Sequence, residues 1–173
     1  FCAWLSGRTG MKFTLPDEAQ WERACRAGTD TPMWYGPVNA DFSTLENLAD
    51  SSFKAVETIE PWKLPAGAIH PWRPAVDGVN DGHRVSAPVA SFQPNPWGFF
   101  DMHGNAAEWT LTPCGENGGD RVVRGGAWGD RPHRAASGFR RQYPPWQRIY
   151  NVGFRVACTD AGAGTVVQTA AVR

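Results

Sequence analysis

Hydrophobic positions recur with helical spacing at the start of the chain and lose that spacing after residue 28. The opening residues Phe1–Ser6 (FCAWLS) are apolar at helical intervals, and the GRTG that follows is typical of a chain leaving a helix. An extended segment, Lys12–Leu15, leads into a second predicted helix, in which Pro16 suits an early position. The two acidic residues after Pro16 complement the positive helix end, and Gly28 is the predicted C-cap. The inward face of this helix is predicted to carry Ala19, Trp21, Ala24 and Cys25.

The long interval Thr29–Ala90 shows little periodicity, and Pro, Gly, Asp and Asn recur throughout it. Such an interval counts against an ordinary compact fold unless a metal ion or a tryptophan-rich loop core holds it. Short β-like segments follow at Arg121–Arg124 and Gly153–Ala157, separated by a loop rich in Gly, Arg and aromatic residues. The final residues, Thr159–Arg173, are small and weakly hydrophobic, which predicts a tail or linker.

The composition narrows the class of protein. A chain of 173 residues fits one domain, and its 9 Trp, 19 Gly and 14 Pro favour turns and long loops over a helix bundle. Because 17 basic residues balance 17 acidic ones, nucleic acid is not expected as a partner. No apolar run approaches the roughly 20 residues of a membrane span. The start of the chain has no signal-peptide pattern, which says little about the compartment because a mature chain would have lost its signal. The compartment stays open, with an extracytoplasmic location favoured.

The four cysteines lie far apart in the sequence. They form no CxxC pair and no Cys/His cluster, which argues against a zinc site. Two alternatives remain open. One is a long-range disulfide, in which Cys2 and Cys158 would join the two ends of the chain, and the other is four buried free thiols.

Four long motifs occur in a fixed order: LPDEAQWERACRAGT (15–29), NDGHRVSAPVASFQPNPWGFFDMHGNAAEWT (80–110), RVVRGGAW (121–128) and NVGFRVA (151–157). Together they resemble the sulfatase-modifying-factor family, whose domain is similar to the formylglycine-generating enzyme. The resemblance runs from Phe1 to about Cys158. It implies an α+β fold, a variant of the C-type-lectin fold, with two helices, short antiparallel strands, little other regular structure and long calcium-held loops.

Domains of this family begin well before the helix that ends in FCAWLS. The resemblance therefore implies that residues 1–158 are the C-terminal portion of such a domain, with the remainder cleaved or carried on another chain. A cut domain exposes apolar surface that has to be covered. We therefore expect a protein partner or a covering N-terminal segment.

The segment Asn95–Thr110 is too polar for a core strand and too broken by Pro and Gly for a helix. Calcium takes six to eight oxygen ligands, including carboxylates and carbonyls. In the family this segment holds one calcium ion, and the matching positions are Asp101, Gly104, Ala106 and Glu108. The alternative is that the two carboxylates only cap turns and accept hydrogen bonds from backbone amides.

A second calcium site of the family matches two phrases in the aperiodic interval, ENLAD and NDGH. The resemblance assigns it to Asn47, the Leu48 carbonyl, Asp81 and the His83 carbonyl. An ion there would explain how loops without periodicity become ordered. We therefore expect one or two calcium ions.

The reaction that names the family oxidises a sulfatase cysteine to formylglycine, with a copper ion held by two cysteines shortly after the RGG motif. Here no cysteine lies between Cys114 and Cys158. Asp130 stands about where the first copper ligand would be, and an Arg or a small residue where the second would be. A carboxylate does not replace a thiolate for Cu(I). No copper and no formylglycine-generating activity are therefore expected.

Another branch of the family makes sulfoxides with an iron held by three histidines of a separate helical domain. The four histidines here, His70, His83, His103 and His133, show no such spacing, so this chain alone does not hold that iron. His103 is predicted to be a turn residue beside the calcium loop, and His133 a solvated loop residue.

Arginine and aromatic residues are concentrated between residues 124 and 155, a composition typical of interface hot spots. Arg124 and Arg155 are predicted to be structural and to bond loop carbonyls. The predicted ligand surface consists of Arg134, Arg140, Arg141 and Tyr143. The expected role is non-catalytic recognition, or a subunit of a larger assembly. The alternative is an oxidative enzyme of the formylglycine-generating or sulfoxide-synthase type, whose metal ligands lie in another portion or partner chain.

Overall fold

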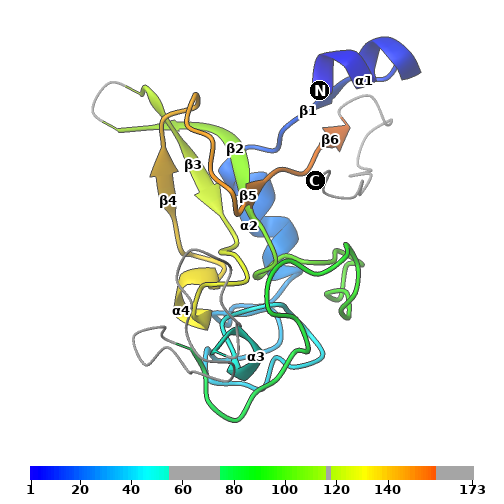
Figure 1. The fold of residues 1–173 in the computed structure, drawn as a ribbon. Helices are drawn as coiled ribbons and strands as arrows, with labels where there is room; N and C mark the ends of the chain where they lie inside the picture. Colours follow the sequence, from blue (N-terminus) through cyan, green and yellow to red (C-terminus); the bar gives the residue numbers. More distant parts are fainter. Residues whose placement is uncertain (55–74, 116–117, 159–173) are drawn as a thin grey trace.

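The computed structural model describes residues 1–54, 75–115 and 118–158, and the predicted tail 159–173 lies outside them. The described part is an α+β arrangement with four helices, a two-stranded sheet and a four-stranded sheet. In the view of Figure 1 the larger sheet lies above loops that include α3 (Ser51–Lys54) and α4 (Pro132–Ala135). These two short helices are additional to the two that the sequence predicted. Within the described residues, no helix has the length and apolar character needed to cross a bilayer.

The first predicted helix is present as α1 (Cys2–Thr9) and ends at Gly10, whose φ of 72° gives the left-handed cap. The segment after it contributes β1 (Phe13–Thr14), which pairs antiparallel with β6 (Ala157–Cys158). This pairing brings the beginning and end of the described chain together, as Figure 1 shows. An apolar cluster forms here from Phe13, Val156 and Cys158, with Cys2, Leu5 and Phe154 packed against it.

All four cysteines are free thiols, but they differ in environment. Cys25 is buried and Cys114 is partly exposed. Cys2 packs against the cluster that contains Cys158. The fold therefore brings Cys2 and Cys158 into one cluster, and these are the two cysteines for which the sequence allowed a disulfide.

The second predicted helix is α2 (Glu18–Arg26), and its start follows from a capping box. The Asp17 side chain accepts from the Gln20 backbone N–H, and the Gln20 side chain accepts from the Asp17 N–H. Pro16 therefore lies just before the cap rather than inside the helix. The predicted C-cap is wrong by one residue, because Ala27 takes the left-handed conformation at φ 46°.

The four-stranded sheet has the order β4-β3-β2-β5. Its strands are β2 (Ala107–Cys114), β3 (Asp120–Arg124), β4 (Arg141–Tyr143) and β5 (Val152–Gly153). The β2–β3 and β3–β4 pairs are antiparallel, but β2 and β5 are parallel, so the expectation of antiparallel strands alone is wrong. The longest strand, β2, begins inside a segment that its polar composition excluded from strands. The reason is that its buried polar side chains have partners on other elements: Glu108 bonds Trp21 of α2 and also Arg155, and Thr110 bonds a carbonyl of β3.

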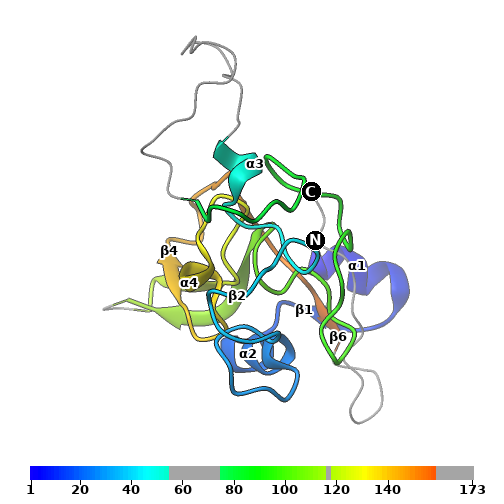
Figure 2. The same ribbon diagram turned by 90° about the horizontal axis from the view of Figure 1, so that it is seen from below.

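Helix α2 lies along β2 on one face of the sheet (Figure 2). The Trp21 indole Nε1–H donates to Glu108 Oε2 at 2.6 Å, and the Glu18 N–H donates to Thr112 Oγ1 at 2.8 Å. The Arg124 guanidinium donates to Glu18 and Glu22 and also to the Ser137 carbonyl. Arg124 therefore has the predicted structural role, but its partners are mainly carboxylates of α2 and only one loop carbonyl.

The loops below the sheet have their own apolar clusters. Met33, Phe42, Leu48 and Ala135 form one, and Ala49, Phe53 and Ala75 form another, with Trp128 packed against it. Backbone hydrogen bonds connect these loops across the sequence, for example from Ala49 N to Asp130 O at 3.0 Å. The loop layer therefore has order without regular strands or long helices.

Candidate metal and ligand sites

The two groups of predicted calcium ligands meet at one backbone contact. The Asn105 N–H donates to the Asn47 carbonyl at 2.8 Å, and the Gly104 N–H donates to the Gly125 carbonyl at 2.8 Å. Gly104 has φ +94°, and a Cβ on it would lie 2.2 Å from the Asn47 carbonyl oxygen. A glycine is required for this approach, which places the segment that follows Asp101 directly against the segment that begins at Asn47.

Asp101, the first predicted ligand of the central segment, has one unsatisfied oxygen. Its Oδ2 accepts from the Ala90 N–H at 2.9 Å, whereas its Oδ1 is buried without a hydrogen-bond partner. Burial raises the pKa of this carboxyl, and the nearby Glu108 carboxylate adds to the increase. A buried carboxylate oxygen without a partner is costly, and a cation would satisfy it.

Glu108, the last predicted ligand of that segment, already has two cationic or polar partners. Arg155 donates to it from Nε at 2.5 Å and from Nη2 at 2.7 Å, and Trp21 donates to Oε2. The Arg155 Nη2 also donates to the carbonyls of Phe100 and Asp101, at 3.2 and 3.3 Å. Arg155 therefore bonds loop carbonyls, as predicted, and it also forms an ion pair with a predicted metal ligand.

The second predicted site also contains a buried oxygen without a hydrogen-bond partner, Asn47 Oδ1. Its amide nitrogen donates to the Val85 carbonyl at 2.9 Å, so the side-chain orientation is fixed. The Asp81 carboxylate accepts from the Leu48 N–H at 3.0 Å and from the His83 N–H at 2.7 Å. The four predicted positions thus lie on two segments that are bonded to each other.

Asp50 lies beside the second predicted site, although the sequence analysis did not select it as a ligand. Its Oδ2 accepts from the Asp81 N–H at 2.5 Å, and its Oδ1 accepts from Ser52 Oγ at 2.6 Å. Burial raises the pKa of Asp81 to about 6, and the charge of Asp50 contributes to that increase. Asp50 is the last residue of the same ENLAD phrase, but that phrase alone does not distinguish it from an aspartate that caps a turn.

The donor set at both sites consists largely of amide, carbonyl and carboxylate oxygens, which suits a hard cation. Among the described residues, no group of three or more His, Cys, Asp or Glu side chains is arranged to hold a metal ion. His103, predicted beside the calcium loop, instead lies in the core. Its Nδ1 bonds the Ala135 carbonyl at 2.7 Å, and its Nε2 accepts from the Trp34 N–H at 3.1 Å. Burial lowers the pKa of His103 to about 4.

The four residues of the predicted ligand surface do not share one set of partners. Arg141 and Tyr143 lie two positions apart in β4 and therefore share one face of the sheet, whereas Arg140 precedes the strand. The Arg140 guanidinium donates to Glu18 of α2 at 2.6 and 2.8 Å. Tyr143 packs instead on Trp109, with ring centroids 6.2 Å apart.

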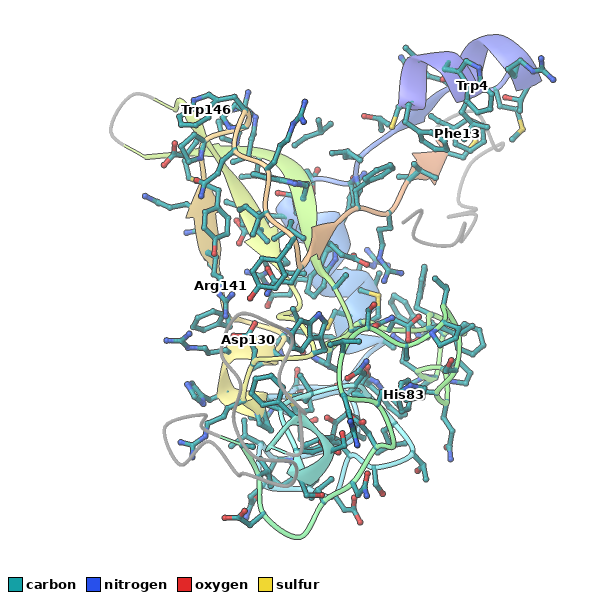
Figure 3. The ribbon with its side chains drawn as sticks, in the orientation of Figure 1. Trp4, Phe13, His83, Asp130, Arg141 and Trp146 are labelled. Atoms are coloured by element: carbon teal, nitrogen blue, oxygen red, sulfur yellow. The ribbon has the colours of Figure 1, made fainter. Side chains whose placement is uncertain are left out.

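Arg134 and Arg141 converge on the buried carboxylate of Asp130. Arg141 Nη2 donates to Asp130 Oδ1, and Arg134 Nη1 lies 3.9 Å from the same oxygen. Figure 3 shows Arg141 directed toward Asp130. The other carboxylate oxygen accepts from the Ala127 N–H at 3.0 Å. Arg134 and Arg141 therefore meet at Asp130, whereas Arg140 pairs with Glu18 of α2. His133 is exposed on α4, as expected of a solvated residue.

A model of the sulfatase-modifying factor enzyme 1-like domain matches residues 1–160. The chain belongs to this family. The formylglycine-generating enzyme of Bos taurus is 28% identical over 176 residues, which cover 91% of this chain and 40% of that protein. The inactive C-alpha-formylglycine-generating enzyme 2 of Mus musculus is 31% identical over 164 residues, covering 91% of this chain and 44% of that protein. The chain spans less than half the length of these relatives.

The fold agrees with this membership of the sulfatase-modifying-factor family. The structure of PvdO from Pseudomonas aeruginosa superposes with a TM-score of 0.67 at 27% identity, covering 90% of this chain and 56% of that chain. The sequence resemblance matches Asp130 to about the position of the first copper cysteine in the family. In this structure that position has a carboxylate that lies near Arg141 and Arg134.

Proposed function

We propose that this chain is a non-catalytic recognition domain of the sulfatase-modifying-factor family, with loops held by calcium. The observation that carries this proposal is the ion pair of Asp130 with Arg141. A copper centre of the family needs a thiolate there, and a carboxylate is a hard ligand that does not replace a thiolate for Cu(I). A relative that is 31% identical is named as inactive, which supports a non-catalytic role within the family.

The positions of the described thiols support the same proposal. Cys25 is buried, and burial raises its pKa to about 12, so it remains a protonated thiol rather than a metal-binding thiolate. Cys2 and Cys158 share a cluster at the β1–β6 pair, which Figure 1 places away from α4 and the RGG loop. Cys114 ends β2. Among the described residues, no second thiol accompanies Cys114 there.

Three buried side-chain oxygens of the described residues lack a hydrogen-bond partner, and two of them, Asp101 Oδ1 and Asn47 Oδ1, support calcium. The third is the hydroxyl of Tyr35. Asp101 and Asn47 each lie in one of the two sites that the family resemblance indicates. The central site would use Asp101 and Glu108 with the carbonyls of Gly104 and Ala106. The other would use Asn47 and Asp81 with the carbonyls of Leu48 and His83, and Asp50 would add negative charge beside it. Bound calcium would join the loop segments and neutralise their carboxylates.

The recognition surface that we propose is Arg134, Arg141 and Tyr143, and the ligand would be a partner protein. Arg141 is fixed by Asp130, and Tyr143 is supported by Trp109. Arginine and tyrosine held in place by neighbours lose little side-chain entropy on binding, which favours them as hot spots. The alternative, an oxidative enzyme completed by another portion or chain, requires metal ligands from outside this chain.

Two measurements on the purified protein test the two parts of the proposal, calcium binding and the lack of a copper-dependent reaction. Native mass spectrometry before and after treatment with EGTA should show one or two calcium ions lost together with a decrease in thermal stability. Competition with a Cu(I)–bicinchoninate complex should leave copper on the chelator, and a cysteine-containing peptide should cause no oxygen consumption. Stoichiometric Cu(I) binding with peptide-dependent oxygen consumption would overturn the non-catalytic assignment.

The surface has a separate test that does not require a known partner. Peptides selected from a displayed random library against the wild-type domain should lose binding to Arg134→Ala and Tyr143→Ala. The matched control is Arg140→Ala, because Arg140 precedes β4 and pairs with Glu18 of α2. Loss of binding in the control alone would place the ligand on the α2 side and contradict the proposed surface.

A further inference from the structure

A groove lies along one side of α2, outside the calcium loops and outside the proposed recognition surface. It has a volume of about 480 Å³. Helix residues three and four apart form one wall, and the turn after the helix and Trp97 form the rest. The lining consists of Ala19, Glu22, Arg23, Arg26, Gly28, Thr29, Asp30 and Trp97. A volume between 300 and 1,000 Å³ is typical of sites for small molecules.

Trp97 is held at this groove by a buried asparagine. Asn95 is 3% exposed, and its Oδ1 accepts from the N–H groups of Trp97 and Phe99, both at 3.0 Å. The Asn95 Nδ2 donates to the Ala24 carbonyl of α2 at 2.7 Å. These bonds attach the turn that carries Trp97 to the helix, yet the indole remains 49% exposed. The fold therefore presents a large aromatic surface to solvent from a fixed backbone.

The charged side chains of the groove fall into a paired and an unpaired set. Arg26 donates to Glu22 Oε1 at 2.8 Å and to the Thr31 carbonyl at 3.3 Å, so both members of that pair are engaged. The Arg23 guanidinium lies 5.8 Å from the centroid of the Trp97 ring. Among the described residues, neither Arg23 nor Asp30 takes part in a salt bridge.

We propose that this groove binds the ring of a neutral carbohydrate. The exposed indole offers a flat surface against which the C–H face of a pyranose can stack. Arg23, already oriented by the same indole, can donate to hydroxyl oxygens, and Asp30 can accept from hydroxyl hydrogens. A hydroxyl both donates and accepts, so one uncharged ligand satisfies both residues. The volume suits one or two sugar rings.

The charge of the groove argues against other small ligands. Two arginines and two carboxylates give its lining no net charge, so it offers little attraction to a phosphate or another strong anion. A proline-rich peptide would also stack on a tryptophan, but such ligands use grooves with several aromatic residues. Here Trp97 is the only aromatic side chain among the described lining residues.

The test uses two-dimensional ¹H–¹⁵N NMR spectra of the whole protein, with the Trp97 indole N–H signal assigned by its loss in Trp97→Phe. The probes are methyl β-D-glucopyranoside, methyl β-D-galactopyranoside and N,N′-diacetylchitobiose, each titrated to about 10 mM because single-ring ligands bind weakly. At least one probe should shift the Trp97 signal in a saturable manner. Binding to the variants is followed by the backbone amide signals of the groove residues, because both Trp97 variants lack the indole signal. By that readout Arg23→Ala should weaken the binding at least tenfold, and Trp97→Ala should abolish it.

The matched control is Trp4→Ala, which removes a tryptophan that is 60% exposed on α1, and it should leave carbohydrate binding unchanged. Trp97→Phe keeps an aromatic ring and should retain weakened binding, which guards against a folding defect in Trp97→Ala. The inference is overturned if none of the three sugars shifts the signal, or if inorganic phosphate or decaproline does so instead. Equal losses in the Trp4 and Trp97 variants would also overturn it, because they would show non-specific contact with exposed indoles.

Discussion

Replacement of Gly104 by alanine tests the contact on which the two proposed calcium sites depend. Gly104 has φ +94°, and an added Cβ would lie 2.2 Å from the Asn47 carbonyl oxygen and 2.8 Å from Leu48 Cδ2. The left-handed backbone alone costs a non-glycine residue about 1 kcal/mol. The clash with a backbone atom that is itself hydrogen-bonded adds about 2 kcal/mol, a typical cost of overpacking. We therefore expect Gly104→Ala to lower the free energy of unfolding by about 3 kcal/mol.

The matched control is Gly28→Ala, because Gly28 has a nearly identical φ of +90° and no atom within 4 Å of the added Cβ. Urea denaturation, followed by tryptophan fluorescence in the presence of calcium, should show a loss of only about 1 kcal/mol in this control. Equal losses in the two variants would refute the reasoning, because they would show that backbone strain accounts for the whole effect. A slope unchanged between variants would confirm that the comparison concerns stability alone.

Three further predictions concern the buried charges. Removal of calcium with EGTA should lower the melting temperature by about 5–10 °C where calcium had been present at a hundredfold excess over its Kd, and Asp101→Ala, measured by calorimetry, should show a smaller decrease. His103 has a folded pKa of about 4, below its value in the unfolded chain, so the unfolded state binds more protons as the pH falls from about 6.5 to 4. Stability should therefore decrease by about 3 kcal/mol across that window, and urea titrations of His103→Gln should show a weaker pH dependence. Asp130→Ala should cost about 3 kcal/mol because it leaves the Arg141 guanidinium unpaired, and the double variant with Arg141→Leu should lose less than the sum of the single variants.

The elements whose local sequence determines their structure were predictable. The α2 helix has its capping residues, its acidic first turn and its buried Trp21 in one continuous stretch, so only its C-cap was misplaced by one position. Strand β2 was missed because Glu108 and Thr110 look unsuitable for a buried strand until their partners on other elements are known. The same limit applied to the sites. The family resemblance indicated Asp101 and Asn47, but only the fold showed that both retain an oxygen without a partner.

The division of the predicted ligand surface has a similar cause. Arg140 and Arg141 are adjacent in the sequence, and composition alone could not separate them. In the fold β4 begins at Arg141, which pairs with Asp130, and Arg140 just before the strand pairs with Glu18. Asp50 was missed because nothing in ENLAD distinguishes an aspartate that caps a turn from one that is buried and accepts a hydrogen bond from the Asp81 backbone.

The buried carboxylates among the described residues differ in how their charge is compensated, and the difference follows the two layers of the fold: the proposed ligand Glu108 lies in the sheet layer and is itself paired with an arginine. Glu108 has Arg155 as its ion-pair partner, and Asp130 has Arg141. Four other buried carboxylates form no salt bridge with any described residue, and all belong to the loop segments that carry the proposed ligands: Glu46, Asp50, Asp81 and Asp101. Burial raises the pKa of Glu46, Asp81 and Asp101, so these groups would be stabilised in their ionised form by a nearby cation. A divalent cation in these loops would therefore provide the compensation that arginine provides in the sheet layer.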